Sequence, residues 1–229
     1  YRPIGKDFPV FLHPKTNEEY ALARTEKKTG TGYGGFTFYY GKDVTLEEDL
    51  SRRDFTINAI AQDDAGVIID PFNGQNDIKN KLFRHVSDAF FEDPLRAIRL
   101  ARFFSYDHLK DFDIDASTIE CIEKIVSSRE IADISSDRIW SETERALSNS
   151  NPSKYFEKII SLNLLDPYFS KLTKSSCDSH NNKTLRWAEL QINNDFELGS
   201  ELPLPNDFKN IVEVCKSEKK DTNQDDLIL

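Results

Sequence analysis

Two short segments of this chain combine guanidinium and carboxylate groups with apolar neighbours. The first reads RRDFTINA at residues 52–59, and the second reads EDPLRAIRLARF at residues 92–103. An ion among apolar side chains is costly unless it has a partner or a ligand, and arginine offers a planar fork of donors that suits carboxylate and phosphate. These segments therefore predict a site for an anionic ligand.

The second segment begins with a pattern typical of a helix start. Asp93 can cap the free amides, and Pro94 suits the first helical position. On such a helix Arg96 lies about 60° round the axis from Asp93, since successive residues are about 100° apart. A carboxylate beside a guanidinium could read the edge of a nucleobase. The alternative is that Asp93 is only a cap and Arg96 its ion-pair partner.

The first segment suggests a phosphate site. Arg52, Arg53 and Asp54 could hold a triphosphate, with Asn58 reaching a ribose hydroxyl. The alternative is a surface charge cluster. Taken together, the two segments favour the ligand hypothesis, because several arginines around an apolar region need an anion.

Other candidate groups carry weaker signals. Glu18 and Glu19 alternate on a predicted strand, so only one of them can face a shared site, and a lone strand carboxylate is commonly solvated. The four histidines have no ligand spacing, which gives no support to a metal-dependent hydrolase. The three cysteines are far apart and are expected to be reduced thiols.

Composition sets broad limits on the class of protein. The chain has 229 residues, of which 38% are hydrophobic and 31% charged, and its formal net charge is −10. Most of the acidic excess falls after residue 110, so the net charge does not exclude a basic cleft in the first half. No apolar run reaches the roughly 18 residues of a membrane span, and a cytoplasmic location is expected.

The pattern along the chain predicts strands first and helices later. Hairpins are expected from residues 8–12 with 18–25 and from residues 57–62 with 67–70, and a glycine-rich loop at 30–35. Thr45 and Glu48 predict a capping box. Helices are predicted over residues 116–127, 136–148, 152–162 and 207–216, followed by a disordered tail from 217 to 226.

Three motifs of this chain, taken together, resemble those of a known enzyme family. RRDFTINAIA, IIDPFNG and EDPLRAIRLARF occur in the order found in class II tRNA nucleotidyltransferases, the CCA-adding enzymes, and in the related bacterial poly(A) polymerases. The opening GKDFPVFLHPKTNEEYALARTEKKTGTGYGGF resembles the bacterial CCA-adding branch. The resemblance covers roughly residues 1–165 and is specific, because three motifs occur together in order.

The resemblance implies template-independent addition of CMP and AMP from CTP and ATP to the tRNA 3′ end, with release of pyrophosphate. Asp93 and Arg96 would read the base edge in place of a nucleic-acid template. Three arginines would contact the nucleotide largely through its phosphates, and two side chains would shape the ribose side. These five are Arg53, Arg99 and Arg102, then Asp54 and Asn58. Glu19 resembles the third carboxylate of the catalytic strand.

The family uses Mg²⁺. Its principal ligands, an Asp-x-Asp pair, are expected upstream of Tyr1, so the chain is expected to be N-terminally truncated; it also contains no methionine. The implied fold class is a partial α/β (α+β) nucleotidyltransferase head over residues 1–84, a helical base-reading neck over 85–165 and a helical body and tail over 166–229. The alternatives are a poly(A) polymerase acting on RNA 3′ ends and a catalytically inactive nucleotide- or RNA-binding fragment.

Overall fold

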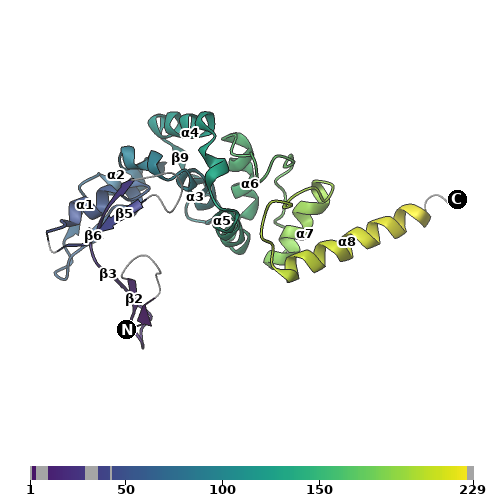
Figure 1. The fold of residues 1–229 in the computed structure, drawn as a ribbon, viewed down its shortest axis with the longest axis horizontal. Coiled ribbons are helices and arrows are strands. Elements are labelled where there is room, and N and C mark those ends of the chain that lie inside the picture. Colours follow the sequence, from purple (N-terminus) through teal and green to yellow (C-terminus); the bar gives the residue numbers. More distant parts are fainter. Residues whose placement is uncertain (1, 4–9, 29–35, 42, 226–229) are drawn as a thin grey trace. The chain divides into compact units, whose positions relative to one another are not determined.

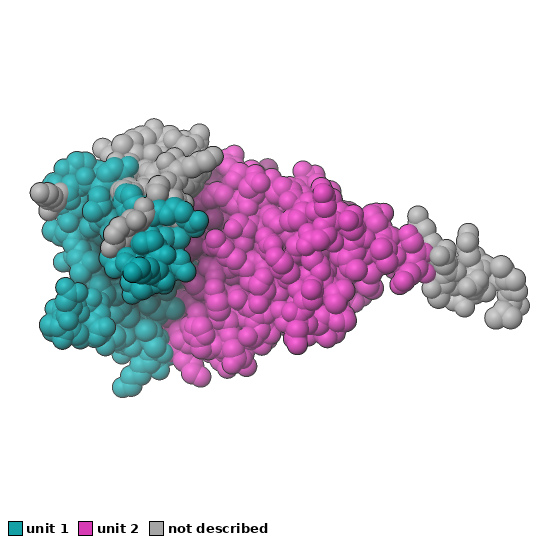
Figure 2. Space-filling view, turned by 90° about the horizontal axis from the view of Figure 1, so that it is seen from below, with its two compact units in different colours: residues 1–80, 84–93 teal, residues 81–83, 94–229 magenta. Residues whose placement is uncertain are grey.

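The computed structural model describes residues 2–3, 10–28, 36–41 and 43–225. The chain divides into two compact units, which Figure 2 shows in different colours. Unit 1 comprises residues 1–80 and 84–93, and unit 2 comprises residues 81–83 and 94–229. Among the described residues, unit 1 holds seven of the nine strands and unit 2 holds the longer helices. The predicted order, with strands before helices, is confirmed.

Unit 1 contains three small antiparallel sheets. Their strands are β1 (Arg2–Pro3), β2 (Val10–Leu12), β3 (Glu19–Ala21), β4 (Thr25–Lys28), β5 (Phe36–Tyr39), β6 (Ala61–Gln62) and β7 (Ile68–Ile69). The sheets are β1-β2-β3, β4-β5 and β6-β7. The predicted first hairpin is confirmed, since β2 pairs with β3 and His13 N donates to Glu18 O at 2.8 Å. The glycine-rich stretch at residues 30–35 lies outside the described residues.

Short helical segments complete unit 1. They are α1 (Leu46–Ser51), η2 (Thr56–Asn58), α2 (Gly74–Lys79) and η3 (Asp88–Glu92). The predicted capping box is confirmed, because Glu48 N donates to Thr45 Oγ1 at 3.2 Å and Thr45 N donates to Glu48 Oε2 at 2.8 Å. The second hairpin also forms, as β6 and β7, but the strand predicted from Ile57 is wrong at its start. Residues 56–58 form a 3₁₀ turn, in which the side-chain amide of Asn58 donates back to the Asp54 carboxylate at 3.0 Å.

Unit 2 is helical apart from one parallel strand pair, β8 (Leu82–Phe83) with β9 (Asp113–Ile114). Its helices are α3 (Leu95–Phe103), α4 (Ala116–Ser128), η4 (Glu130–Asp133), α5 (Ser136–Ser148), α6 (Pro152–Ser161), α7 (Lys183–Asn193) and α8 (Asn206–Asp225). Within the unit, α3 packs against α5 and α6, and α7 packs against α8 (Figure 1). Its core includes edge-to-face contacts of Trp140 with Trp187 and Phe208.

The helix predictions are largely confirmed, with two differences. α3 begins at Leu95, one residue later than predicted, although Pro94 already has helical angles (φ −57°, ψ −20°). The disorder predicted after residue 216 is wrong, because α8 continues to Asp225. Lys216 pairs with Glu213 one turn back at 2.9 Å, and Lys219 reaches Asp195 at 3.4 Å, so side-chain charges support this polar helix.

The cysteines and the hydropathy of the helices agree with the sequence-based expectations. Cys121 and Cys177 are buried and Cys215 is half-buried, and all three are free thiols as predicted. Across the described residues, we find no helix with both the length and the apolar character that crossing a bilayer demands.

Candidate nucleotide site

In unit 1, a buried carboxylate organises the two arginines of the first motif. Asp49 on α1 accepts hydrogen bonds from Arg52 Nη2 at 2.5 Å, from Arg53 Nη2 at 3.2 Å and from the Arg24 backbone N at 3.1 Å. Burial alone would raise the pKa of Asp49, but the hydrogen bonds and the charge of Arg52 outweigh it and lower the pKa.

The two arginines differ in how much of their donor capacity is used. Arg52 Nε also donates to the Arg24 carbonyl at 3.0 Å, and its side chain is only 17% exposed. The Arg53 side chain is 45% exposed. Arg52 is therefore held by the protein itself, and Arg53 is the arginine of this pair that an anionic ligand can reach.

Asp54 and Asn58 lie together in unit 1. Asp54 is buried, and its Oδ1 accepts from Asn58 Nδ2 and from Phe55 N, both at 3.0 Å. The backbone before η2 is fixed by pairing with residues 84–86, since Val86 N donates to Asp54 O at 3.3 Å and Phe55 bridges His85. This arrangement orients the Asn58 amide through the buried carboxylate.

Glu19 lies at the beginning of β3, opposite Leu12 of β2, and is exposed. Its neighbour Glu18 is used locally, because Glu18 Oε2 accepts from Thr16 Oγ1 at 2.8 Å. The two carboxylates thus differ in their surroundings, and Glu19 is the one without a described local hydrogen bond. Its catalytic role stays a prediction.

In unit 2, the arginines of α3 converge on a second buried carboxylate. Glu142 of α5 is 3% exposed and receives the Nε–H of Arg102 in a short charge-assisted hydrogen bond. Arg99 Nη1 lies 3.7 Å from Glu142 Oε1, and Arg145 Nη1 lies 3.4 Å from the same oxygen. Arg102 also donates to the Tyr106 hydroxyl at 2.7 Å. One buried carboxylate therefore balances a cluster of three guanidinium groups.

The α3 arginines also differ in exposure. Arg96 and Arg102 are buried, at 9% and 5% exposure, whereas the Arg99 side chain is 31% exposed. Arg102 stacks over the Phe103 ring, with its guanidinium carbon 4.6 Å from the ring centroid. Arg99 is thus the member of this helix best placed to meet a ligand in solution, and Arg102 is deeply engaged with its own fold.

Asp93 is the last residue of unit 1 and follows η3 directly. Its backbone is extended (φ −127°, ψ 98°), the conformation that a residue before Pro favours. Asp93 and Arg96 are three residues apart on either side of the division between the units.

The structural roles of Asp49, Asp77 and Glu142 were missed by sequence reasoning. Asp77 of α2 is 3% exposed and accepts from Thr56 Oγ1 at 2.7 Å. A signal for Glu142 was available, because it lies between Ile139 and Ala146 on the mostly apolar stripe of α5. An acidic residue on such a stripe predicts a buried carboxylate with a cationic partner.

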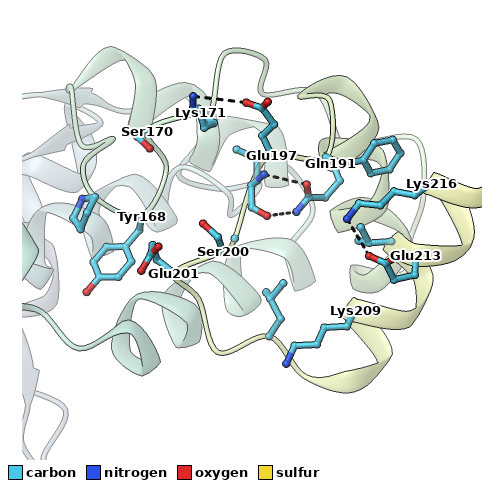
Figure 3. Close-up of a pocket in the computed structure, with 16 residues that line it drawn as sticks. Tyr168, Ser170, Lys171, Gln191, Glu197, Ser200, Glu201, Lys209, Glu213 and Lys216 are labelled. Carbon is cyan, nitrogen blue, oxygen red and sulfur yellow. Dashed lines mark hydrogen bonds and ion pairs between the residues drawn. The ribbon is translucent and has the colours of Figure 1, made fainter. Parts of the chain in front are cut away.

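The described residues contain a cavity but no cluster of metal-binding side chains. Among the described residues, no group of three or more His, Cys, Asp or Glu side chains could hold a metal ion. A cavity of about 580 Å³ lies between the loop at 196–204 and α8 (Figure 3). None of the predicted site residues lines it.

The charges around that cavity balance. The cavity is lined by three lysines and three glutamates, namely Lys171, Lys209, Lys216, Glu197, Glu201 and Glu213. Two of the lysines are paired within the lining, Lys216 with Glu213 at 2.9 Å and Lys171 with Glu197 at 3.9 Å (Figure 3). A phosphate group would gain little there.

Comparison with known families assigns the class. Residues 10–84 match the family described as "Poly A polymerase head domain", and residues 111–175 match the family described as "Probable RNA and SrmB- binding site of polymerase A". The chain belongs to the family of class II tRNA nucleotidyltransferases and poly(A) polymerases.

The curated relatives most similar in sequence include several proteins named Multifunctional CCA protein. The chain is 57% identical over 153 residues to the Multifunctional CCA protein of Aliivibrio salmonicida, a match that covers 67% of this chain and 38% of that protein. The chain spans less than half the length of the curated relatives it matches.

Solved structures confirm the predicted fold class. The CCA-adding enzyme of Bacillus stearothermophilus in complex with CTP matches with a TM-score of 0.73 and 27% identity, over 93% of this chain and 54% of that one. The Thermotoga maritima CCA-adding enzyme complexed with tRNA shares the fold alone, with a TM-score of 0.61 and 23% identity over 92% and 56%. The chain has a partial nucleotidyltransferase head followed by a mostly helical remainder.

Proposed function

We propose that the protein carrying this chain is a CCA tRNA nucleotidyltransferase, which adds CMP, CMP and AMP to the tRNA 3′ end with release of pyrophosphate. The observation that carries the proposal is the fold match over 93% of the chain to a CCA-adding enzyme in complex with CTP. The 57% identity to a Multifunctional CCA protein supports it independently.

Each unit contributes residues to the proposed reaction. In unit 1, Arg53 offers an exposed guanidinium for phosphate, and the Asp54–Asn58 pair, joined at 3.0 Å, would face the ribose. In unit 2, Arg99 would add a second phosphate contact. Arg102, which is already bonded to Glu142 and Tyr106, would act on the nucleotide through the packing of α3 as well as through its charge.

Base selection is assigned to Asp93 and Arg96, as the family resemblance implies. A carboxylate accepts from an exocyclic amino group, and a guanidinium donates to ring nitrogen or carbonyl oxygen, so together they can replace a templating base. Glu19 is proposed as a catalytic-strand carboxylate. Mg²⁺ would supply charge stabilisation at the transferred phosphate.

The test is extension of tRNA by the complete gene product. tRNA lacking its CCA end is incubated with CTP, ATP and Mg²⁺, and the product length is read at nucleotide resolution. Growth by three nucleotides followed by a stop is expected. CTP binding without any growth would instead favour an inactive nucleotide-binding protein and would overturn the proposal.

A poly(A) polymerase is the second candidate, because the head-domain family that matches residues 10–84 is described by that activity. The same assay separates the two. A poly(A) polymerase would build long A tracts from ATP alone on general RNA 3′ ends, whereas the proposed enzyme stops after one A and needs CTP first.

A further inference from the structure

Asp77 is a buried carboxylate of unit 1 that the proposed nucleotide contacts do not include. It lies on α2, is 3% exposed, and its Oδ2 accepts from Thr56 Oγ1 at 2.7 Å and from Arg84 Nε at 3.3 Å. A buried carboxylate needs partners for its charge, and here both are supplied by two facing backbone segments. Asp77 therefore ties those segments together.

One of the two segments carries the proposed ribose contacts. Thr56 is the first residue of η2, which ends at Asn58, and the Asn58 amide donates to Asp54 at 3.0 Å. The Thr56 backbone N donates to Arg84 O at 2.9 Å, so Asp77 bonds the side chains of two residues that are already paired through their main chains. A shift of Thr56 must therefore move Asn58, two residues further on in the same turn.

The helix that presents Asp77 is itself held tightly against this turn. A Cβ added at Gly74 would lie 2.1 Å from the Thr56 carbonyl oxygen, so α2 meets η2 at backbone contact and only glycine fits. Asp70 holds the start of α2, because its carboxylate accepts from Gly74 N at 2.7 Å and from Gln75 N at 2.9 Å. The start of α2, one turn before Asp77, is thus held against the turn that carries Thr56.

We propose that Asp77 is a positioning residue for ribose recognition, acting through Thr56 on the Asp54–Asn58 pair. This inference rests on the proposed function, because it takes that pair as the ribose contact. Without the Asp77 carboxylate, the Thr56 hydroxyl and the Arg84 guanidinium lose a shared buried acceptor, and η2 is free to change its orientation. The Asn58 amide then no longer meets the ribose hydroxyl in one fixed geometry.

The test compares Asp77→Ala, which removes the acceptor, and Thr56→Val with the wild-type complete gene product. For each, KM and kcat are measured with CTP and with 2′-deoxy-CTP. We expect KM for CTP to rise about tenfold in both variants, equivalent to about 1.4 kcal/mol, with kcat little changed, since the loss is one of nucleotide binding. The preference for CTP over 2′-deoxy-CTP should fall in parallel, because the ribose hydroxyl is the group affected.

Two controls separate positioning from stability. Thr56→Ser keeps the hydroxyl and should restore the CTP preference, and Asp64→Asn removes an exposed carboxylate of the same unit and should change nothing. An unchanged preference in Asp77→Ala and Thr56→Val, whether or not the melting temperature falls, would show that Asp77 only holds the fold. Dissociation constants for the two nucleotides decide the matter even where wild type extends no tRNA, in which case the proposed function alone fails.

Discussion

Replacing Glu142 should destabilise unit 2 more than loss of any exposed ion pair in it. Its carboxylate is 3% exposed and faces three guanidinium groups, those of Arg99, Arg102 and Arg145. Removing one partner of a buried pair leaves an uncompensated charge, which costs far more than the pair itself contributes. Glu142→Gln keeps the size and polarity of the side chain and removes only its charge.

The three arginines set the magnitude of that cost. Arg102 is 5% exposed and cannot recover its hydration, whereas the Arg145 side chain is 61% exposed and can. Breaking a buried pair typically costs about 3–5 kcal/mol. At roughly 2–4 °C per kcal/mol for a domain of this size class, the melting temperature should fall by about 6–20 °C. Arg145→Ala should cost no more than about 1 kcal/mol, as expected for an exposed pair.

The assay is unfolding in urea, monitored through the fluorescence of the tryptophans. Both tryptophans of the chain, Trp140 and Trp187, lie in unit 2 with ring centroids 5.5 Å apart, so the signal reports this unit. The Arg145→Ala variant serves as the exposed-pair control. If Glu142→Gln unfolds at the same urea concentration as Arg145→Ala, Glu142 does not carry the buried charge balance and the reasoning is refuted.

Two further predictions concern base selection and acid stability. Asp93→Ala and Arg96→Ala should each weaken discrimination between CTP and ATP more than they lower the melting temperature; normal selectivity with a large loss of stability would instead support the cap and ion-pair alternative. The folded-state pKa of Asp49 lies below its unfolded value of about 3.9, so its contribution to stability is complete above that pH and is lost as pH falls through the folded-state pKa. Asp49→Asn should therefore make the stability of unit 1 less sensitive to acid, and an unchanged acid transition in near-ultraviolet circular dichroism would contradict this.

Local sequence signals predicted the helices well. The Thr45–Glu48 capping box, Pro152 at the start of α6 and the apolar stripe of α5 each act within one or two turns, so the sequence contains the whole interaction. The predicted end of α8, at residue 216, is too early because the later residues are polar and form no apolar face. Its helix is supported by charge pairs such as Lys219 with Asp195, which are 24 residues apart and invisible to periodicity.

The candidate site was predicted by residue type but not by partner. Asp54 and Asn58 are four residues apart, and their contact follows from a local turn. Arg52 and Arg53 meet Asp49 within four residues, but other partners are distant. Arg102 meets Glu142 from another helix, 40 residues away, and Thr56 meets Asp77 across 21 residues. A sequence alone does not identify such distant pairs, because each pair depends on which helices and turns pack together.

The buried carboxylates also show how an acidic chain can present guanidinium groups to solvent. Asp49 and Glu142 lie inside the fold and are each bonded to arginines, while the side chains of Arg53 and Arg99 keep 45% and 31% of their surface exposed. The acids thus set the direction of the guanidinium groups without presenting their own charge to solvent. The net charge of −10 arises mostly after residue 110, away from the first motif in sequence. Local geometry, rather than total charge, therefore decides whether a phosphate can bind.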